Sequence, residues 1–185
     1  IGWQGLPFPE EYGGGGCTFL DLSILLEEMG RACLPSPFFS TVVLGGLTIL
    51  DVGSEGQKQD FLPKIAGGER IMTLALTEPS AGYDAGDAYV ADWMICATRT
   101  SKRKKPEEGV SLLLVDSTSP GLTCTLLQSI AKDKQCEVAF EKVVVPGENV
   151  LGEIDQGWSG VSRTLQRAAV AKSIEMIGGA QRVLE

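Results

Sequence analysis

The sequence predicts an α+β protein in which helices come first, strands fill the middle and a long helix ends the chain. Apolar residues recur at helical spacing up to about residue 70. Short β-branched runs, separated by Gly, Pro and charged turns, fill residues 71–155. From residue 156 to 185 an apolar helical pattern runs without proline. We expect an N-terminal helical domain at 1–70, a central antiparallel sheet or barrel at 71–155 and a C-terminal helix at 156–185.

The composition is that of a globular protein, with 43% hydrophobic and 22% charged residues. The formal net charge of −8 argues against a nucleic-acid-binding surface, which needs Lys and Arg spread over a broad face. One basic cluster, Lys102 to Lys105, is too short to reverse that balance. No apolar run approaches the roughly 20 residues that span a bilayer, so we expect no transmembrane segment.

The cysteine and histidine counts restrict the chemistry. Five widely spaced cysteines without a CxxC pair indicate reduced thiols, and so a cytoplasmic protein, or one of the mitochondrial matrix in a eukaryote. The absence of histidine excludes a Ser-His-Asp triad and a His-based metal site within this chain. Any acid–base chemistry falls to carboxylates, Lys or Tyr.

Three helices are expected before residue 70. Residues 1–16 precede them as an ordered loop, because their aromatic side chains favour burial over a flexible linker. Thr18 and Asp21 form a capping box for a helix ending near Gly30. A second helix follows Pro37 and runs to about Val52. A third, capped by Ser54 and Gln57, stops at Gly67. The apolar stripes of these helices are typical of core packing.

Five strands are expected after residue 70, at 71–76, 91–98, 110–115, 122–126 and 136–145. The first of them breaks at Thr77-Glu78-Pro79, because proline donates no backbone hydrogen bond and keeps Glu78 extended. The small residues Ser80-Ala81-Gly82 that follow let a flat ligand lie close to bare backbone groups. On composition alone, this is also how an ordinary strand followed by a loop looks.

This segment resembles the flavin-contacting signature of the acyl-CoA dehydrogenase family. Thr77, Glu78, Pro79, Ala81, Gly82 and Asp84 match it, and Tyr83 departs from it, since the family usually has Ser there. Three further stretches resemble the same family in the same order. They are Gly2 to Leu6 with Pro9 to Gly14, then Val145 to Glu153, and Arg167 to Ala169 with Gly178 to Glu185.

The resemblance implies FAD-dependent α,β-dehydrogenation of an acyl-CoA thioester. A carboxylate removes the α-proton while hydride leaves the β-carbon for flavin N5. It also implies an electron-transfer flavoprotein or similar acceptor, a homo- or hetero-oligomer, and a C-terminal helical bundle that the last helix begins. The alternative is a non-catalytic, family-like subunit with a structural role in a heteromeric complex.

The resemblance also implies site residues. Leu74, Leu76, Thr77 and Gly82 match flavin-contacting positions, and Gly82 and Tyr83 match the place where the loop meets acyl-CoA. Tyr83 either contacts substrate or packs on the surface. The Lys102 to Lys105 loop either approaches the CoA phosphates or is a solvated hairpin loop.

The catalytic base is expected beyond Glu185. Glu175 and Glu185 on the last helix are more typical of solvated surface carboxylates than of a base.

Two features of the family are missing. Only six residues lie between Asp84 and Ala91, where the family has two strands, a turn and an aromatic motif that stacks on the flavin. The family's C-terminal bundle is only beginning at Glu185. We therefore expect the 185 residues to be part of a longer polypeptide, which an intact mass above 19.7 kDa would show.

Overall fold

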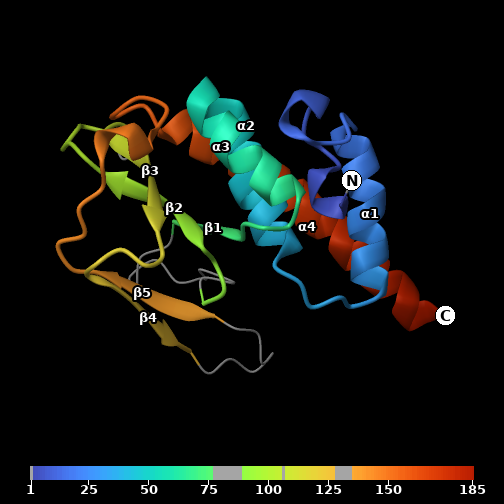
Figure 1. The fold of residues 1–185 in the computed structure, drawn as a ribbon. Helices are drawn as coiled ribbons and strands as arrows, with labels where there is room; N and C mark the ends of the chain where they lie inside the picture. Colours follow the sequence, from blue (N-terminus) through green and yellow to red (C-terminus); the bar gives the residue numbers. More distant parts are fainter. Residues whose placement is uncertain (1, 77–88, 106, 128–134) are drawn as a thin grey trace.

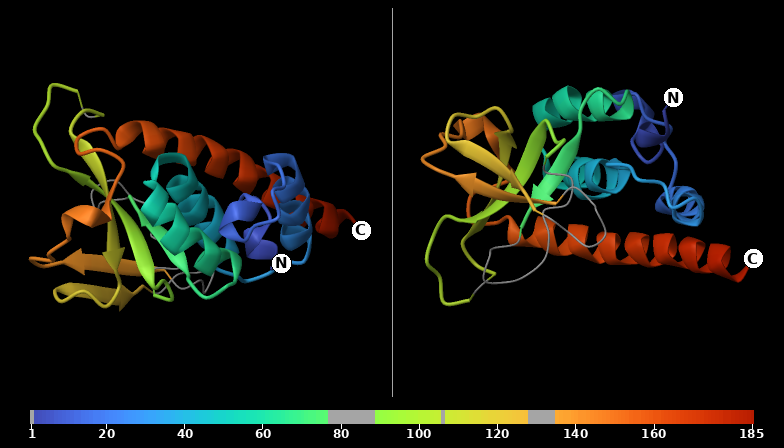
Figure 2. Two further views of the ribbon diagram at one scale, coloured as in Figure 1. Left: turned by 45° about the horizontal axis from the view of Figure 1, so that its top comes forward. Right: turned by 90° about the horizontal axis from the view of Figure 1, so that it is seen from below.

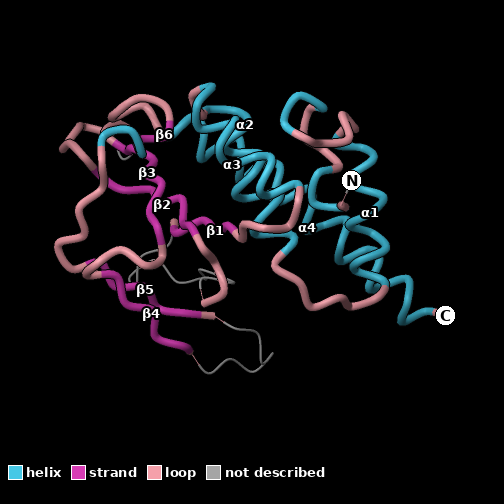
Figure 3. Tube along the Cα trace, viewed as in Figure 1, coloured by secondary structure: helices cyan, strands magenta, loops and turns pink. Residues whose placement is uncertain are grey.

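The computed structural model describes residues 2–76, 89–105, 107–127 and 135–185. Helices form one side of the molecule and strands the other (Figures 1 and 3). The long helix α4, Trp158–Leu184, runs along the helical side and past α1 to the C-terminus (Figure 2). This arrangement of helices and a mixed sheet confirms the α+β fold class. None of the helices in the described ranges has an apolar stretch long enough to cross a membrane.

The N-terminal loop is ordered, as predicted. Two short 3-10 turns, η1 (Trp3–Gly5) and η2 (Glu10–Tyr12), fold it against the helices. Phe8 is fully buried and Tyr12 nearly so, and the Tyr12 hydroxyl lies 3.1 Å from both carboxylate oxygens of Glu55. Trp3 differs from the expectation of burial, because 64% of its surface is exposed.

Both predicted capping boxes are present. In α1, Phe19–Arg31, Thr18 and Asp21 exchange side-chain and backbone hydrogen bonds. In α3, Glu55–Ala66, Ser54 and Gln57 do the same. These local contacts satisfy N–H groups that a helix start leaves unpaired, so both starts could be located from the sequence.

The second predicted helix has the expected extent but two geometries. Phe39–Gly46 is a π-helix, η3, and Leu47–Val52 is the α-helix α2. Two small residues of η3, Gly45 and Gly46, admit close neighbours from other elements. A Cβ at Gly45 would lie 2.4 Å from Met72, and one at Gly46 would lie 2.3 Å from the Phe8 ring. These glycines therefore bring a strand and the N-terminal loop close to η3.

The sheet is mixed, whereas the sequence predicts antiparallel pairing throughout. Its order is β1-β2-β3-β6, with bounds Met72–Ala75, Trp93–Arg99, Val110–Asp116 and Val150–Leu151. β1 pairs with β2 in parallel, and β2–β3 and β3–β6 pair antiparallel. A parallel pair requires a connection that returns the chain to the same end of the sheet, which local sequence patterns do not reveal.

A separate two-stranded ribbon consists of β4, Leu122–Leu126, and β5, Cys136–Phe140. The strand predicted at 136–145 therefore ends five residues early. Lys142 adopts a left-handed backbone with φ +54°, which a continuing strand cannot contain. The short strand β6 was not predicted from the sequence.

Helix α4 packs on α1 and α2 through small and polar side chains. Gly30 and Gly178 face the opposite backbone across the α1–α4 contact. The buried hydroxyls of Thr48 and Thr164 lie 2.6 Å apart. Asp51 of α2 receives hydrogen bonds of 2.6 and 3.1 Å from Arg167. The helical side is thus held together by close backbone approach and a partly buried ion pair, as well as by its apolar core.

Candidate functional site

The described part of the segment singled out from the sequence is the end of strand β1 and the residue after it, Leu76. Strand β1 lies at one edge of the four-stranded sheet. The Leu74 side chain is 6% exposed and belongs to the core, and Leu76 is half-buried against the same core. Their side chains therefore pack in the core. Only their backbone N–H and C=O groups are available to a ligand.

The position of β1 is fixed by Thr41 of η3. Its buried hydroxyl accepts a hydrogen bond from the Met72 N–H at 3.2 Å and donates to the Met72 carbonyl at 3.4 Å. On the other side β1 pairs with β2, with Ala75 opposite Cys96. Burial raises the pKa of the Cys96 thiol to about 11, so this thiol is neutral at pH 7 and is a poor nucleophile.

Three of the predicted site residues, Thr77, Gly82 and Tyr83, lie outside the described residues. The structure therefore describes only Leu74, on β1, and Leu76, which directly follows that strand. The roles of all five predicted site residues remain predictions.

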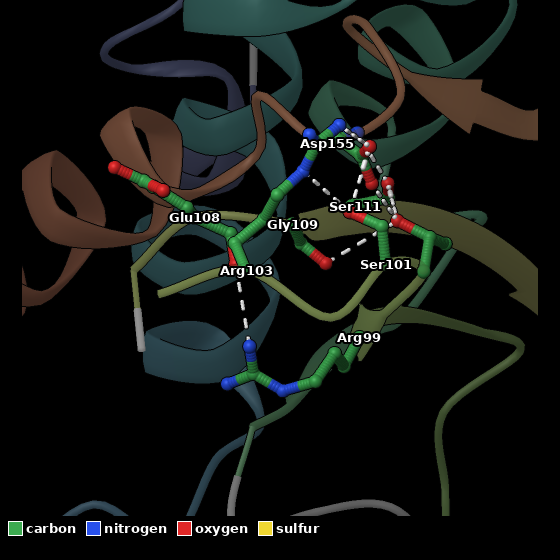
Figure 4. A network of polar contacts seen from close by, with 8 residues as sticks. Arg99, Ser101, Arg103, Glu108, Gly109, Ser111 and Asp155 are labelled. Carbon is green, nitrogen blue, oxygen red and sulfur yellow. Dashed lines mark hydrogen bonds and ion pairs between the residues drawn. The ribbon is translucent and has the colours of Figure 1, made fainter. Parts of the chain in front are cut away.

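A second polar site joins the β2–β3 hairpin loop to the turn before α4 (Figure 4). The carboxylate of Asp155 accepts hydrogen bonds from Thr100 at 2.6 Å, Ser101 at 2.9 Å and Arg103 at 3.2 Å. The Asp155 N–H donates to the Ser111 hydroxyl at 2.8 Å. The hydrogen bond from Thr100, followed by that from Ser101, holds the pKa of Asp155 below its ordinary value.

An open pocket of about 620 Å³ lies beside this network. Its lining mixes acidic, basic and aromatic side chains: Arg103, Lys105, Glu107, Glu108, Gly109, Asp155, Gln156, Trp158 and Ser159. One cation of the predicted basic cluster, Arg103, is thus paired with Asp155, while Lys105 faces the pocket. Sequence reasoning missed this network, because Thr100 and Asp155 are 55 residues apart and neither belongs to a local motif.

The two carboxylates considered as bases are both paired with cations. Glu175 lies 2.6 Å from Lys172, and Glu185 lies 2.6 Å from Arg31 and 3.4 Å from Arg182. Both carboxylates thus lie in ion pairs that solvent reaches, as expected of surface carboxylates.

Comparison with known proteins links this fold to one family. Residues 1–69 match the model of the acyl-CoA dehydrogenase N-terminal domain. The Bacillus subtilis protein YngJ, named a probable acyl-CoA dehydrogenase, is 32% identical over all of this chain and 56% of its own length. The acyl-CoA dehydrogenase FadE26 of Mycobacterium tuberculosis is 33% identical over 92% of this chain and 49% of its own.

The chain spans about half the length of the curated relatives that it matches. The alignment with YngJ also extends over 213 positions, against 185 residues in this chain. YngJ therefore has residues at positions where this chain has none.

Solved structures agree in fold across nearly the whole chain. The Tcur3481-Tcur3483 steroid ACAD has a TM-score of 0.88 at 28% identity, over 98% of this chain and 53% of that one. Butyryl-CoA dehydrogenase from Megasphaera elsdenii has a TM-score of 0.87 at 26% identity, over 99% and 56%.

The ChsE4-ChsE5 complex of M. tuberculosis has a TM-score of 0.77 at 29% identity, over 90% of this chain and 49% of that one. Sequence motifs, fold and relatives lead to the same conclusion, and the chain belongs to the acyl-CoA dehydrogenase family.

Proposed function

We propose that this chain is part of an FAD-dependent enzyme that introduces a double bond between the α- and β-carbons of an acyl-CoA thioester. The observation that carries the proposal is the edge strand β1, which is anchored at Met72 and ends at Ala75, two residues before the Thr77 to Asp84 signature in the sequence. The names of the relatives add support, since both curated relatives described above are acyl-CoA dehydrogenases by name.

The described residues can contact a flavin through the backbone of strand β1. An edge strand leaves backbone N–H and C=O groups on one side, and a flat ring with donors and acceptors along its edge suits such groups. Because the Leu74 side chain is in the core, its part in holding FAD is assigned to its backbone, and so is that of Leu76. Bound FAD would supply the hydride acceptor.

The acid–base part of the reaction needs a carboxylate, and neither carboxylate of the last helix that was considered for this role suits it. Glu175 and Glu185 are committed to ion pairs. We assign the base to a residue beyond Glu185. A positioned base accelerates a reaction by about 10²–10⁴-fold. Substitution of this base should therefore slow turnover strongly while acyl-CoA still binds.

An anaerobic titration of the whole purified protein with a panel of acyl-CoAs tests the proposal. We expect a yellow protein whose flavin absorbance bleaches, with the most effective acyl-CoA setting the chain-length class. A yellow protein that binds acyl-CoA without bleaching would show that the base is lacking, and a colourless protein would contradict the proposal.

A second candidate function is a structural subunit of a heteromeric complex. It is favoured by the ChsE4-ChsE5 complex among the solved structures and by the absence of the aromatic flavin-stacking motif from this sequence. A colourless protein that becomes part of a yellow, active assembly only with a second, different chain would support this candidate.

The remaining expectations stay predictions. They are an electron-transfer flavoprotein or similar acceptor, a cytoplasmic or mitochondrial-matrix location, and the domain division at residues 70 and 155.

A further inference from the structure

Two of the five cysteines are neighbours on the β4–β5 ribbon, which lies below the main sheet in Figure 1. In this antiparallel pair Cys124 is opposite Val138, and Cys136 is opposite Leu126. The two cysteines are therefore diagonal neighbours whose side chains share one face of the ribbon. None of the five cysteines is in a disulfide, so both are present as thiols.

The thiols lie in a small apolar cluster between the ribbon and β2. Met94 is fully buried there, Cys136 is 4% exposed, and Cys124 is half-buried with Leu122 and Val138. Burial raises the pKa of both thiols. The neighbouring Cys136 raises the pKa of Cys124 further, which agrees with the diagonal placement of the two side chains on one face of the ribbon. Cys124 is the one that solvent reaches more easily.

We propose that Cys124 and Cys136 form a reversible disulfide across the ribbon when the protein meets a small-molecule disulfide such as oxidised glutathione. Most of the Cys124 thiol stays protonated because its pKa is raised, but it is half-buried, and its minor thiolate fraction attacks one sulfur of the oxidant and releases one glutathione. The Cys136 thiolate then attacks the Cys124 sulfur of this mixed disulfide and releases the second glutathione. The two protein thiols lose two electrons and two protons, and the oxidant gains them as two glutathione thiols.

The cross-link has a definite structural effect. A two-stranded ribbon is marginally stable by itself, and among the described residues β4–β5 shares no ladder with the main sheet. A bond between Cys124 and Cys136 restricts the separation of β4 from β5. The oxidised ribbon therefore opens less often than the reduced one.

Peptide mapping of the whole purified protein, kept dilute and treated with oxidised glutathione, tests this proposal. We expect a peptide pair joined through Cys124 and Cys136, and hydrogen exchange in residues 122–126 and 136–140 slowed by about tenfold or more. The Cys136→Ser variant should retain one glutathione on Cys124, because the second thiol is missing. The Cys124→Ser variant should leave Cys136 unmodified, because Cys136 is buried.

A Cys17→Ser/Cys33→Ser variant is the matched control and should form the same cross-link as the wild type. If Cys17 or Cys33 takes up glutathione while Cys124 and Cys136 remain thiols, the pair serves packing alone and the proposal is wrong. A disulfide that joins two copies of the chain instead of Cys124 to Cys136 would also overturn it.

Discussion

At the residue scale, one buried hydroxyl determines where the candidate flavin edge lies. Thr41 both accepts from and donates to the backbone of Met72, two residues before Leu74. The Met72 side chain and Thr41 are both buried, so water does not replace this contact. The hydroxyl therefore satisfies polar groups of an edge strand that lacks a second neighbouring strand in the described sheet.

Replacement of Thr41 by Val tests this role. Valine keeps the shape but leaves the Met72 N–H unsatisfied, which costs about 1–3 kcal/mol of unfolding free energy. Denaturant unfolding measures the loss. Thr41→Ser keeps the hydroxyl and should recover most of it, and equal losses in both variants would assign the effect to packing.

The Asp155 network predicts a pH dependence of stability. Its hydrogen bonds lower the folded-state pKa, so the folded carboxylate stays ionised where the unfolded one takes up a proton. The stabilisation is present above the ordinary carboxyl pKa of about 4 and is lost as the pH falls through the lower folded value. Asp155 has φ +66°, a backbone conformation that asparagine also tolerates, so Asp155→Asn changes charge with little strain.

We expect the difference in unfolding free energy between wild type and Asp155→Asn to be largest near pH 7. It should shrink as the pH falls below the ordinary carboxyl pKa of about 4. Unfolding midpoints measured from pH 7 to pH 3 check this. Glu153→Gln, an exposed change in the same turn, serves as the control. A difference that stays constant with pH would show that ionisation of Asp155 does not cause the loss of stability.

At the element scale, the α1–α4 contact depends on two glycines that face the opposite helix. A Cβ at Gly30 would lie 1.9 Å from the Glu175 carbonyl oxygen, and one at Gly178 would lie 1.9 Å from that of Glu27. Both positions meet rigid backbone, so the helices themselves must separate to admit a methyl group. The ion pair between Arg31 and Glu185 lies beyond this contact and joins the same two helices.

Gly178→Ala should therefore destabilise the protein by about 1–3 kcal/mol, as overpacking of a tight core does. The adjacent Gly179→Ala is the matched control. Its Cβ would meet only the Gly30 oxygen at an ordinary 3.5 Å, and alanine favours the helix. Thermal unfolding should show a lower midpoint for the first variant and an equal or higher one for the second.

At the scale of the whole molecule, α4 exposes apolar side chains on the face turned away from α1. Met176 is 68% exposed and Ile177 52%, and Leu165, Val170, Val183 and Leu184 are also exposed. A patch of this kind attracts apolar partners. We expect residues 1–185 produced alone to bind a hydrophobic dye and to self-associate as concentration rises.

A Met176→Gln/Ile177→Gln variant should bind less dye and stay dispersed at the same concentration, with little change in unfolding midpoint, because both side chains face solvent. Dye fluorescence and light scattering measure these effects. As a control, Leu20→Gln exchanges a 72% exposed side chain on α1 and should leave dye binding nearly unchanged. Equal dye binding by the wild type, the double variant and Leu20→Gln would show that the dye binds to another surface.

The sequence by itself determined the order of elements, both capping boxes and the family. Thr18 with Asp21, and Ser54 with Gln57, act within one turn, so their hydrogen bonds are encoded locally. The segment from Leu74 to Asp84 could be singled out because proline and small residues follow an apolar strand. Of its predicted site residues, the structure places Leu74 and Leu76, and it shows that their side chains are used in packing.

Only the tertiary structure decided which distant segments meet. The parallel β1–β2 pairing, the end of β5 before Lys142 and the diagonal placement of Cys124 and Cys136 depend on strand register across long separations. Asp155 meets Thr100 across 55 residues for the same reason. Local pattern fixes which side chains are apolar or can cap a helix, but contacts between distant residues form only when the chain packs as a whole.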